Sequence, residues 1–489
     1  PKFATPTEWN GALSYEGLTI VTHLGNSFTS KKPVPAGIDI ANTDYWSNTG
    51  NYNAQVEQYR KDVENLKEYV NENIEGNSVK KYGATGDGVT DDTAAIKLAL
   101  SSVKGTKNPF VFFPSGQYVV SDNIEIPNGV RMLGICPQTS IKISGENVTY
   151  PDGSWILVTS ESVLQPTNSN TRVGLIGVGA GSVIDGFGIY YPNQPDIFNV
   201  QDGVKKYTPT IRAGFHSRIC NIFSYNASVL INIPEQLSDI RIANISGGVL
   251  YGAIISWWNT DINYIHDILL NNISTIEAAH NQLASQESYD WLRANTIGFD
   301  FHGGDWSHIH NVHMQVCKIG FRLMADTLSG AVRAVRHFNI TKSGCGNVQT
   351  GFAIVGTQDC QCLYNSITHC EVNNEPVTGS LAFNITNVKY TKINYNNIRN
   401  ANFVAINVDG DSDIVEVIGN IIENKPETAD GTYTIIVASK NTIVQANTIK
   451  NDLSAGHHGI IFKTNKGCDN VICTNNNFVN FAEKFSIVS

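Results

Sequence analysis

Apolar residues between positions 52 and 70 recur at alternating spacings of four and three residues. The flanking positions are filled by Lys, Arg and Glu, and the seam consists of Tyr52, Val56, Tyr59, Val63, Leu66 and Val70. Such a seam is typical of a coiled coil, although three heptads are too short to form a stable helix alone. The pattern predicts a coiled-coil helix over residues 51–76. A single amphipathic helix that packs onto its own domain is the alternative.

A second pattern begins near residue 135 and continues through the rest of the chain. An Asn is followed one or two residues later by Ile, Val or Phe, at spacings of 23 to 39 residues. A period in the twenties predicts a β-solenoid with one rung of three short strands per repeat. Asn suits the corners of such rungs because it tolerates left-handed backbone angles. The repeated residues are Asn221, Asn244, Asn272, Asn311, Asn339, Asn365, Asn397, Asn420, Asn447 and Asn477.

Five segments that start with a glycine predict the strand register. They start at Gly252, Gly298, Gly320, Gly351 and Gly459. Because side chains alternate across a strand, aligning these glycines places alternate residues in the core. The predicted core pairs are Phe299 and Phe301, Phe321 and Leu323, and Phe352 and Ile354. The residues between them should form an outer column, with rungs about 4.8 Å apart. That column contains Ser256, Trp258, Asp300, His302, Arg322, Met324 and Asp326.

The stretch 80–133 joins these two patterned regions. Three glycines within residues 83–88 provide the backbone angles of a tight turn. Thr90 is the expected N-cap of a helix over residues 91–103, and an aromatic strand follows at 110–113. Since the end of a solenoid exposes strand edges, this helix is expected to cover the N-terminal end.

Motifs in this stretch resemble a known family. Gly-Asp-Gly-Val-Thr-Asp-Asp-Thr at 86–93 and Phe-Pro-Ser-Gly-Gln-Tyr at 113–118 are similar to the opening of pectate-lyase-like right-handed parallel β-helices, which are frequent among bacteriophage tailspikes. Gly-Phe-Gly-Ile-Tyr-Tyr-Pro-Asn-Gln at 186–194 resembles a further tailspike feature. The resemblance implies an all-β chain, with the entrance and cap helix of a right-handed parallel β-helix over 77–134 and the β-helix itself over 135–489. Because such tailspikes are homotrimers, it also implies a three-stranded coil.

Residues 1–50 are expected to form a separate small β module. A Val-Thr strand, a Gly-Asn turn and a Phe-Thr-Ser strand are followed by Val-Pro-Ala-Gly and Tyr-Trp. This order resembles small chitin-binding-like modules of phage fibres, and attachment to the virion is the other role considered. Tyr45 and Trp46 would either stack on a sugar ring or form the core of the module.

The charge balance limits the possible partners. Lys and Arg number 34 and Asp and Glu number 44, which gives a net charge of −10 and argues against a nucleic-acid or anionic-membrane partner. No apolar run of about 18 residues is present, so no membrane span is expected. The start at Pro1 lacks both an initiator Met and a signal-peptide pattern, and we expect a processed or truncated start.

The nine cysteines and the histidines offer little support for a metal site. Cys360, Cys362 and Cys370 lie near His369, but three buried thiols in neighbouring rungs are favoured over a metal site. His302, His308, His310 and His313 are favoured as surface and turn residues because their spacing crosses strand and corner. We expect neither a metal nor a cofactor, and synthesis in a reducing bacterial cytoplasm.

The outer column has the residue types of an acid/base carbohydrate site. In such a site one carboxylic acid protonates the leaving oxygen and a second carboxylate attacks or activates water. Asp300 and Asp326 are the predicted pair, His302 is an alternative base, and Asp305 is a further catalytic candidate. The alternative interpretation is a solvent-facing sheet with an ordinary Asp–Arg ion pair.

Substrate-binding residues are predicted around this column. Trp258 is expected to stack on a sugar and Arg322 to orient an anionic group, with Trp306 and Asp359 nearby. The longest Asn spacing precedes the column, and residues 276–294 predict a helical insertion beside the binding face. Its candidates for the wall of the groove are Glu277, Glu287, Asp290, Trp291 and Arg293.

By resemblance, the chain is expected to be a trimeric bacteriophage tailspike, carried in the virion by tail or neck proteins, that binds and hydrolyses a host surface glycan. The module and coil resemble appendages of small tailed phages of Gram-positive bacteria. This implies wall teichoic acid or another cell-wall or capsular polysaccharide, cleaved by glycosidase or phosphodiesterase chemistry. The alternative is a non-catalytic receptor-binding adhesin. A third hypothesis is a bacterial cell-surface pectin lyase or hydrolase, which a monomeric chain would favour. A pectin hydrolase is disfavoured because the Asn-Thr-Asp at 259–261 lacks the other polygalacturonase motifs.

Overall fold

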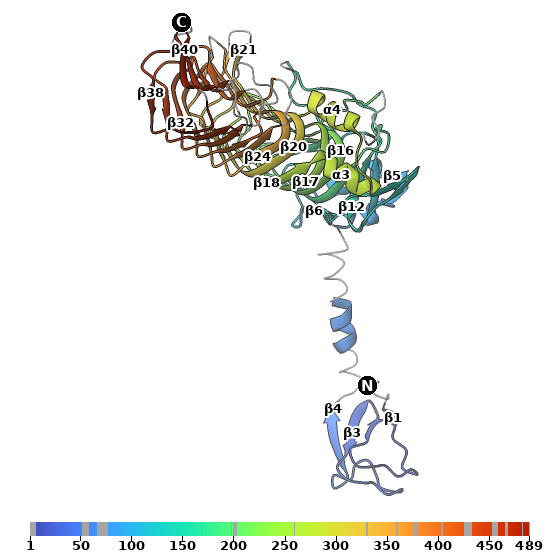
Figure 1. The fold of residues 1–489 in the computed structure, drawn as a ribbon. Coiled ribbons are helices and arrows are strands. Elements are labelled where there is room, and N and C mark those ends of the chain that lie inside the picture. Colours follow the sequence, from blue (N-terminus) through green and yellow to red (C-terminus); the bar gives the residue numbers. More distant parts are fainter. Residues whose placement is uncertain are drawn as a thin grey trace. The chain divides into compact units, whose positions relative to one another are not determined.

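The computed structural model describes residues 6–50, 58–65 and 77–488, apart from residues 168, 197, 199–202, 259, 329–330, 358–359, 375–378, 402–403, 425–432, 452–457, 465–467 and 482 and the side chains of 326–332 and 424. The chain forms two compact units, Pro1–Gly76 and Asn77–Ser489 (Figure 1).

The first unit contains a four-stranded sheet with the order β1-β2-β3-β4. Its strands are β1 (Thr7–Glu8), β2 (Ile20–His23), β3 (Asn26–Ser30) and β4 (Trp46–Gly50). The β2–β3 turn consists of Leu24 and Gly25, with φ angles of 48° and 80°. Two successive left-handed residues match the twist of a hairpin. The predicted turn is therefore displaced by one residue, because Asn26 already begins β3.

The core of this module contains Val21, Val34, Ile40 and Trp46. Trp46 is only 2% exposed, so it lies in the core and is not presented to a ligand. Tyr45 is partly buried against the same core, with the Lys32 ammonium 4.2 Å from its ring centroid. Of the two roles considered for Trp46, the core role fits this burial.

Residues 58–65 are helical, and the remainder of the predicted coil, 51–57 and 66–76, lies outside the described residues. Two residues of the apolar seam fall within the described helix. Tyr59 is 72% exposed and Val63 is 52% exposed. The three-stranded coil stays a prediction.

The second unit begins with η2 (Val79–Tyr82), β5 (Asp87–Asp91) and α2 (Thr93–Ser102). The helix is preceded by Asp92, so the predicted N-cap at Thr90 is wrong. The buried Asp92 carboxylate instead accepts hydrogen bonds from the backbone N–H groups of Thr85 and Gly86, at 2.6 and 3.1 Å. Asp92, which belongs to the family motif at 86–93, therefore holds the turn at Thr85 and Gly86 in place. Because this role is structural, the motif predicts the fold and not the chemistry.

Helix α2 packs Ile96, Ala99 and Leu100 into the same core as the first strands of the β-helix. These are β6 (Phe110–Phe112), β7 (Gly116–Val120) and β8 (Ile124–Ile126). Hairpins outside the rungs are β10 (Lys142–Ser144) with β11 (Asn147–Thr149) and β21 (Asp326–Leu328) with β22 (Ala331–Arg333). The other pairings between described strands of this unit are parallel, and the rungs follow one another from β5 to β40 (Figure 1).

The parallel strands form three faces, and long strands bend from one face to the next. The first face contains β9 (Arg131–Leu133), β23 (Asn339–Thr341), β25 (Cys362–Leu363), β26 (Ser366–Thr368), β29 (Val388–Asn394), β32 (Asp413–Ile418), β35 (Ile443–Gln445) and β38 (Ile472–Thr474). The second contains β7, β12 (Ser154–Val158), β27 (Glu371–Asn374), β30 (Asn397–Arg399), β33 (Ile421–Asn424), β36 (Thr448–Asn451) and β39 (Asn477–Val479). The third contains β8, β13 (Ile176–Val178), β15 (Ile211–Arg212), β19 (Ile297–His302), β28 (Leu381–Thr386), β31 (Val404–Asp409), β34 (Tyr433–Val437), β37 (His458–Lys463) and β40 (Glu483–Val488). The bending strands are β14 (Val183–Tyr190), β16 (Arg218–Ile233), β17 (Arg241–Ser256), β18 (Tyr264–Asn271), β20 (His308–Met324) and β24 (Gly344–Val355).

A column of stacked aromatic rings lies inside the third face. The rings of Phe299, Phe321, Phe352 and Phe383 are separated by 4.9, 4.8 and 4.9 Å, close to the spacing between rungs. The other predicted core residues, Phe301, Leu323 and Ile354, are 0–1% exposed. The register predicted from Gly298, Gly320 and Gly351 is therefore confirmed.

The repeated Asn residues fall into different structural classes. Asn221, Asn244 and Asn311 lie at corners with φ of 54°, 56° and 53°. Asn365, Asn420 and Asn447 also lie at bends between strands, as predicted, but their side chains are fully buried. Asn420 Nδ2 donates to Asn447 Oδ1 at 2.9 Å. The corner prediction is wrong for the strand residues Asn339, Asn397 and Asn477 and for Asn272, which begins α3.

Two helices interrupt the solenoid between β18 and β19. They are α3 (Asn272–His280) and α4 (Gln286–Asn295), so the excursion begins earlier than residue 276. The side chains of Asn271 and Ser285 accept hydrogen bonds from N–H groups in the first turns of α3 and α4. Ile273, Ile276 and Leu292 are buried in a cluster that also contains Leu250 and Val316 from the rungs.

Candidate functional site

The candidate site lies on the third face, around Asp300 in the middle of β19. Asp300 is 7% exposed and lies directly opposite Arg322 on the neighbouring rung. Arg322 donates two hydrogen bonds to this carboxylate, from Nε at 2.7 Å and from Nη2 at 2.5 Å. His302 Nε2 lies 3.0 Å from Asp300 Oδ2. One carboxylate thus holds both a guanidinium and an imidazole.

The ionisation of Asp300 follows from these contacts. Burial raises its pKa, but the hydrogen bonds from His302 and Arg322 outweigh burial and hold the pKa below the ordinary value. Asp300 is therefore ionised at neutral pH. It is suited to orienting His302 and Arg322 and poorly suited to protonating a leaving group, which needs a raised pKa.

Trp257, and not the predicted Trp258, lies beside this cluster. The Trp257 indole stacks on the His302 ring, with centroids 5.2 Å apart and planes 14° apart. Trp257 Nε1 donates to Asn232 Oδ1 at 3.0 Å, which fixes the indole. Trp258 instead lies under the Arg333 guanidinium, 3.7 Å from its ring centroid.

This difference is a register error of one residue. Ile254, Ile255 and Ser256 pair with Phe299, Asp300 and Phe301, whereas the glycine alignment had paired Ser256 with His302. Ser256 is fully buried, so it does not belong to the outer column. The run Gly-Ala-Ile-Ile-Ser at 252–256 has no polar residue until its end, so alternation gave no signal there. Two irregularities in the β16–β17 pairing precede this segment.

The cluster opens into a cavity of about 260 Å³. Besides Asp300, His302 and Arg322, its lining includes Trp257, Lys206 and Asn295. Among the described residues that line this cavity, Asp300 is the one carboxylate, against the cations Arg322 and Lys206. The cavity is therefore suited to an anionic group although the chain as a whole is acidic.

Asp305, another predicted catalytic residue, is not part of the described lining of this cavity. Asp305 lies on the corner after β19, where its Oδ1 is 2.6 Å from His337 Nδ1. Trp306 stacks on the same His337 ring at 4.2 Å between centroids. The side chain of Asp326 and the whole of Asp359 lie outside the described residues. The sequence placed Asp305 near Asp300, but the chain turns between them.

The helical insertion contributes to the site mainly through support. Trp291 packs edge-on against Tyr251, which lines the cavity, at 5.3 Å between centroids. Glu277 accepts a hydrogen bond from Ala284 N at 3.1 Å and so braces the turn between the helices. Arg293 forms an ion pair with Asp290 at 3.5 Å, and Glu287 lies in the first turn of α4. The sequence missed Asn295 at the end of α4, which lines the cavity.

The cysteine cluster is buried in the solenoid. Cys360, Cys362 and Cys370 are 0–2% exposed, and burial raises the pKa of Cys362 and Cys370 to about 12. Their burial matches the predicted core role. Within the described ranges, no group of three or more His, Cys, Asp or Glu side chains is arranged to hold a metal ion. No helix in the part of the chain that the structure describes is long and apolar enough to cross a membrane.

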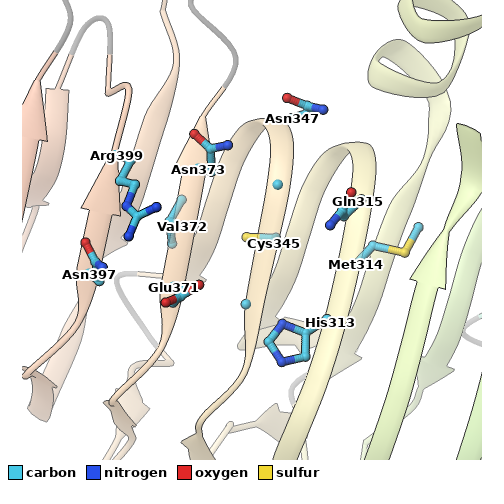
Figure 2. A pocket seen from close by; sticks show the side chains of 12 residues that line it. His313, Met314, Gln315, Cys345, Asn347, Glu371, Val372, Asn373, Asn397 and Arg399 are labelled. Carbon is cyan, nitrogen blue, oxygen red and sulfur yellow. The ribbon is translucent and has the colours of Figure 1, made fainter. Parts of the chain in front are cut away.

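A second hollow, of about 210 Å³, lies on the second face and was missed at the sequence level (Figure 2). It lies where Gly344 and Gly346 of β24 present no side chain between the polar residues of neighbouring rungs. His313 and Glu371 lie opposite Gly344 from its two sides. The available signal was Gly-Cys-Gly at 344–346, where both outward positions are glycine.

Comparisons with known proteins agree with this architecture. Residues 77–174 match the family described as rhamnogalacturonase A/epimerase, pectate lyase-like. The preneck appendage protein of Bacillus phage PZA is 33% identical over 114 residues, which are 21% of this chain and 13% of that protein. A glucan 1,3-beta-glucosidase of Cochliobolus carbonum is 40% identical over 75 residues, which are 15% of this chain and 9% of that protein. The matches thus span only a small part of these curated relatives.

Solved structures extend the likeness to most of the chain. Gene product 12 of bacteriophage phi29, in its pre-mature form, has a TM-score of 0.54 at 13% identity, covering 86% of this chain and 55% of that chain. The surface adhesin PfbA of Streptococcus pneumoniae has a TM-score of 0.51 at 16% identity, covering 84% and 92%. The tailspike of E. coli bacteriophage HK620 has a TM-score of 0.50 at 9% identity, covering 86% and 79%. At these identities the likeness shows the fold, and the chain is thus an all-β protein with a pectate-lyase-like segment that resembles phage tailspike and appendage proteins.

Proposed function

We propose that this chain is a bacteriophage tail appendage that binds an anionic glycan of the host cell surface and hydrolyses it in the cavity around Asp300. The observation that supports this most directly is the Asp300–His302–Arg322 cluster, which opens into a cavity beside Trp257. The likeness to phage appendages and tailspikes supports the virion location. The relatives also include a glucan-processing enzyme, which supports an action on polysaccharide.

His302 is the group best placed to exchange a proton with substrate. Asp300 holds its Nε2 and Trp257 stacks on its ring, so the imidazole is fixed in orientation. A carboxylate beside an imidazole stabilises the imidazolium that forms when the ring takes a proton. His302 would therefore act as the base that activates water, the role first predicted for a carboxylate. The water oxygen bonds to the attacked phosphorus or anomeric carbon. The bridging oxygen of the glycan polymer, which was bonded to that atom, leaves.

The departing oxygen needs a proton, and Asp326 remains the predicted donor. Arg322 and Lys206 line the cavity and favour a substrate with negative charge. Wall teichoic acid and anionic capsular polysaccharide are polymers of this kind. The hydrolysed bond would accordingly be a phosphodiester or a glycosidic bond beside an anionic group.

A non-catalytic adhesin is the second candidate, and one observation favours it. Glycosidases of the paired-carboxylate type need a second acid near the first. The described part of the cavity lining contains only Asp300, which is already ion-paired. A binding site for an anionic sugar would need no second carboxylate.

The proposed assembly is a homotrimer joined to phage tail or neck proteins, with neither nucleic acid nor membrane as a partner. The exposed Tyr59 and Val63 side chains on the helix support a helix–helix contact between subunits. The net charge of −10 argues against binding to nucleic acid.

The test incubates the purified chain with wall teichoic acid and capsular polysaccharide from Gram-positive hosts, and follows polymer length and new end groups. His302→Gln and Asp326→Asn should each lower the rate at least 100-fold, the usual scale of a lost acid or base. Asp305→Asn, at a carboxylate outside the cavity, should leave the rate within about twofold of the parent. Shortening that persists in His302→Gln would refute the site, whereas saturable binding without shortening would establish the adhesin.

A further inference from the structure

The hollow on the second face is built from two parallel rows of outward residues that cross four rungs. His313, Gly344, Glu371 and Asn397 form one row, and Gln315, Gly346, Asn373 and Arg399 form the other. Both positions of the second rung are therefore empty of side chains (Figure 2). Three rung spacings of about 4.8 Å make the hollow about 14 Å long, which suits an elongated ligand.

The two glycine positions differ in whether the structure leaves room for a side chain. A Cβ on Gly344 would lie 2.7 Å from the carbonyl oxygen of Glu371, so close packing of the backbone excludes a side chain. A Cβ on Gly346 would meet only the Gln315 side chain, with Cγ at 3.6 Å and Cδ at 3.8 Å, which are ordinary contacts. Gly346 does not have a left-handed φ. Glycine inside a strand destabilises the fold relative to alanine, because it loses more backbone freedom on folding. A glycine inside a strand marks a bulge, a tight bend, or a site where a ligand approaches closely. The β24–β27 pairing shifts register between Gly346 and Val348, and the space beside Gly346 is in addition open enough for a ligand.

The lining is polar and held in place by the protein. Asn271 Nδ2 donates to Gln315 Oε1 at 2.9 Å, and Asn400 Nδ2 donates to Asn373 Oδ1 at 2.7 Å. Both amide groups are thereby oriented, with their own N–H groups as donors. His313 is partly buried and burial lowers its pKa, so its imidazole is neutral at pH 7 and can both donate and accept. Met314, Cys345 and Val372 point into the core between these residues and form the floor (Figure 2).

This chemistry narrows the class of ligand. Sites for drug-like molecules are mostly apolar and enclosed, whereas this hollow is open and lined by amides, an imidazole, a carboxylate and a guanidinium. Glu371 and the net charge of −10 disfavour a nucleic acid. Neutral donors and acceptors in two rows match the hydroxyl groups of consecutive sugar units, and Arg399 at one end can pair with an anionic substituent.

We infer that the hollow between β20, β24, β27 and β30 is a second glycan-binding site, which holds an oligosaccharide segment of the host glycan along the solenoid axis. The inference rests on the proposed function, because it takes the same polymer as ligand. It concerns a different face from the Asp300 cavity, and the two cavity linings share no residue. Two sites on one chain would hold one polymer by avidity while cleavage proceeds at the first.

The test uses Gly346→Thr, which places a β-branched side chain in the hollow at a position where a Cβ fits. Since threonine favours strands, this variant should be at least as thermally stable as the parent. The control is Thr448→Val on β36 of the same face, beyond the hollow. Each is made alone and in an Arg322→Ala background, in which the first site is disabled.

Titration calorimetry then uses a size-graded set of oligosaccharides cut from wall teichoic acid and capsular polysaccharide. In the Arg322→Ala background, Gly346→Thr should weaken binding of the longer fragments at least tenfold, and Thr448→Val should not. If fragments bind and are cleaved by the parent but Gly346→Thr changes nothing, the second site is refuted and the proposed function stands. If no fragment binds the parent, both are refuted.

Discussion

The most informative single residue is Asp300, whose ionisation holds the cluster together. Because its pKa is lower in the folded protein than in the unfolded chain, it stabilises the fold above the unfolded pKa of about 3.9. That contribution is lost as the pH falls through the folded value. Asp300→Asn leaves the Arg322 guanidinium with weaker acceptors, and should destabilise the fold at pH 7 by about 1–3 kcal/mol.

The measurement is thermal unfolding of parent and Asp300→Asn at a fixed scan rate, since large proteins often unfold irreversibly. The difference between their midpoints should be largest near pH 7 and should shrink below about pH 4. Asp152→Asn, at an exposed carboxylate, serves as the control and should match the parent throughout. An equal difference at pH 7 and pH 3 would show that the Asp300 charge does not stabilise the cluster.

At the scale of elements, the buried Asn ladder joins successive rungs between the first and second faces. Asn420 Nδ2 donates to Ile393 O and to Asn447 Oδ1, and Asn420 Oδ1 accepts from Asn396 N at 2.9 Å. Asn420→Ala would leave these buried groups without partners, at about 1–3 kcal/mol or more. Asn339→Ala is the matched control, because Asn339 is exposed on β23.

Chemical and thermal unfolding of the two variants would check this. Asn420→Ala should lower the unfolding midpoint clearly, and Asn339→Ala should stay within about 0.5 kcal/mol of the parent. Equal effects would mean that the ladder stabilises no more than a surface amide. The pair is a sharp comparison because both residues belong to the same sequence repeat.

That repeat also shows how far the sequence could predict the fold. Its period indicated the solenoid, since rungs of similar length must bury similar apolar residues. It could not distinguish a left-handed corner Asn from a buried ladder Asn or a strand Asn, because all three precede an inward apolar residue. Likewise, strict alternation predicted the facing of Phe299 and Phe321, whereas the apolar run 252–256 left the register one residue off. Gly344 and Gly346 could not be recognised as part of a site from the sequence. The hollow exists only because the residues of the neighbouring rungs surround these glycines.

At the scale of the whole molecule, the prediction concerns assembly. Tyr59 and Val63 belong to the apolar seam and are exposed in the single chain. Burying such a seam against two other copies would remove apolar surface from water, at about 25 cal/mol per Å². Sedimentation should therefore give three times the mass of one chain. Val63→Glu places a charge in the seam and should weaken the trimer, so that it dissociates at higher concentration than the parent.

Lys61→Gln changes the net charge by the same amount at a flanking position of the same helix, and should leave the trimer unaffected. If Val63→Glu and the parent dissociate alike, the subunit contacts lie in residues 77–489 and the helix is only a connector. A parent that is monomeric at every concentration would refute the homotrimer itself. The proposed avidity of the Asp300 cavity and the second-face hollow would then rest on a single chain.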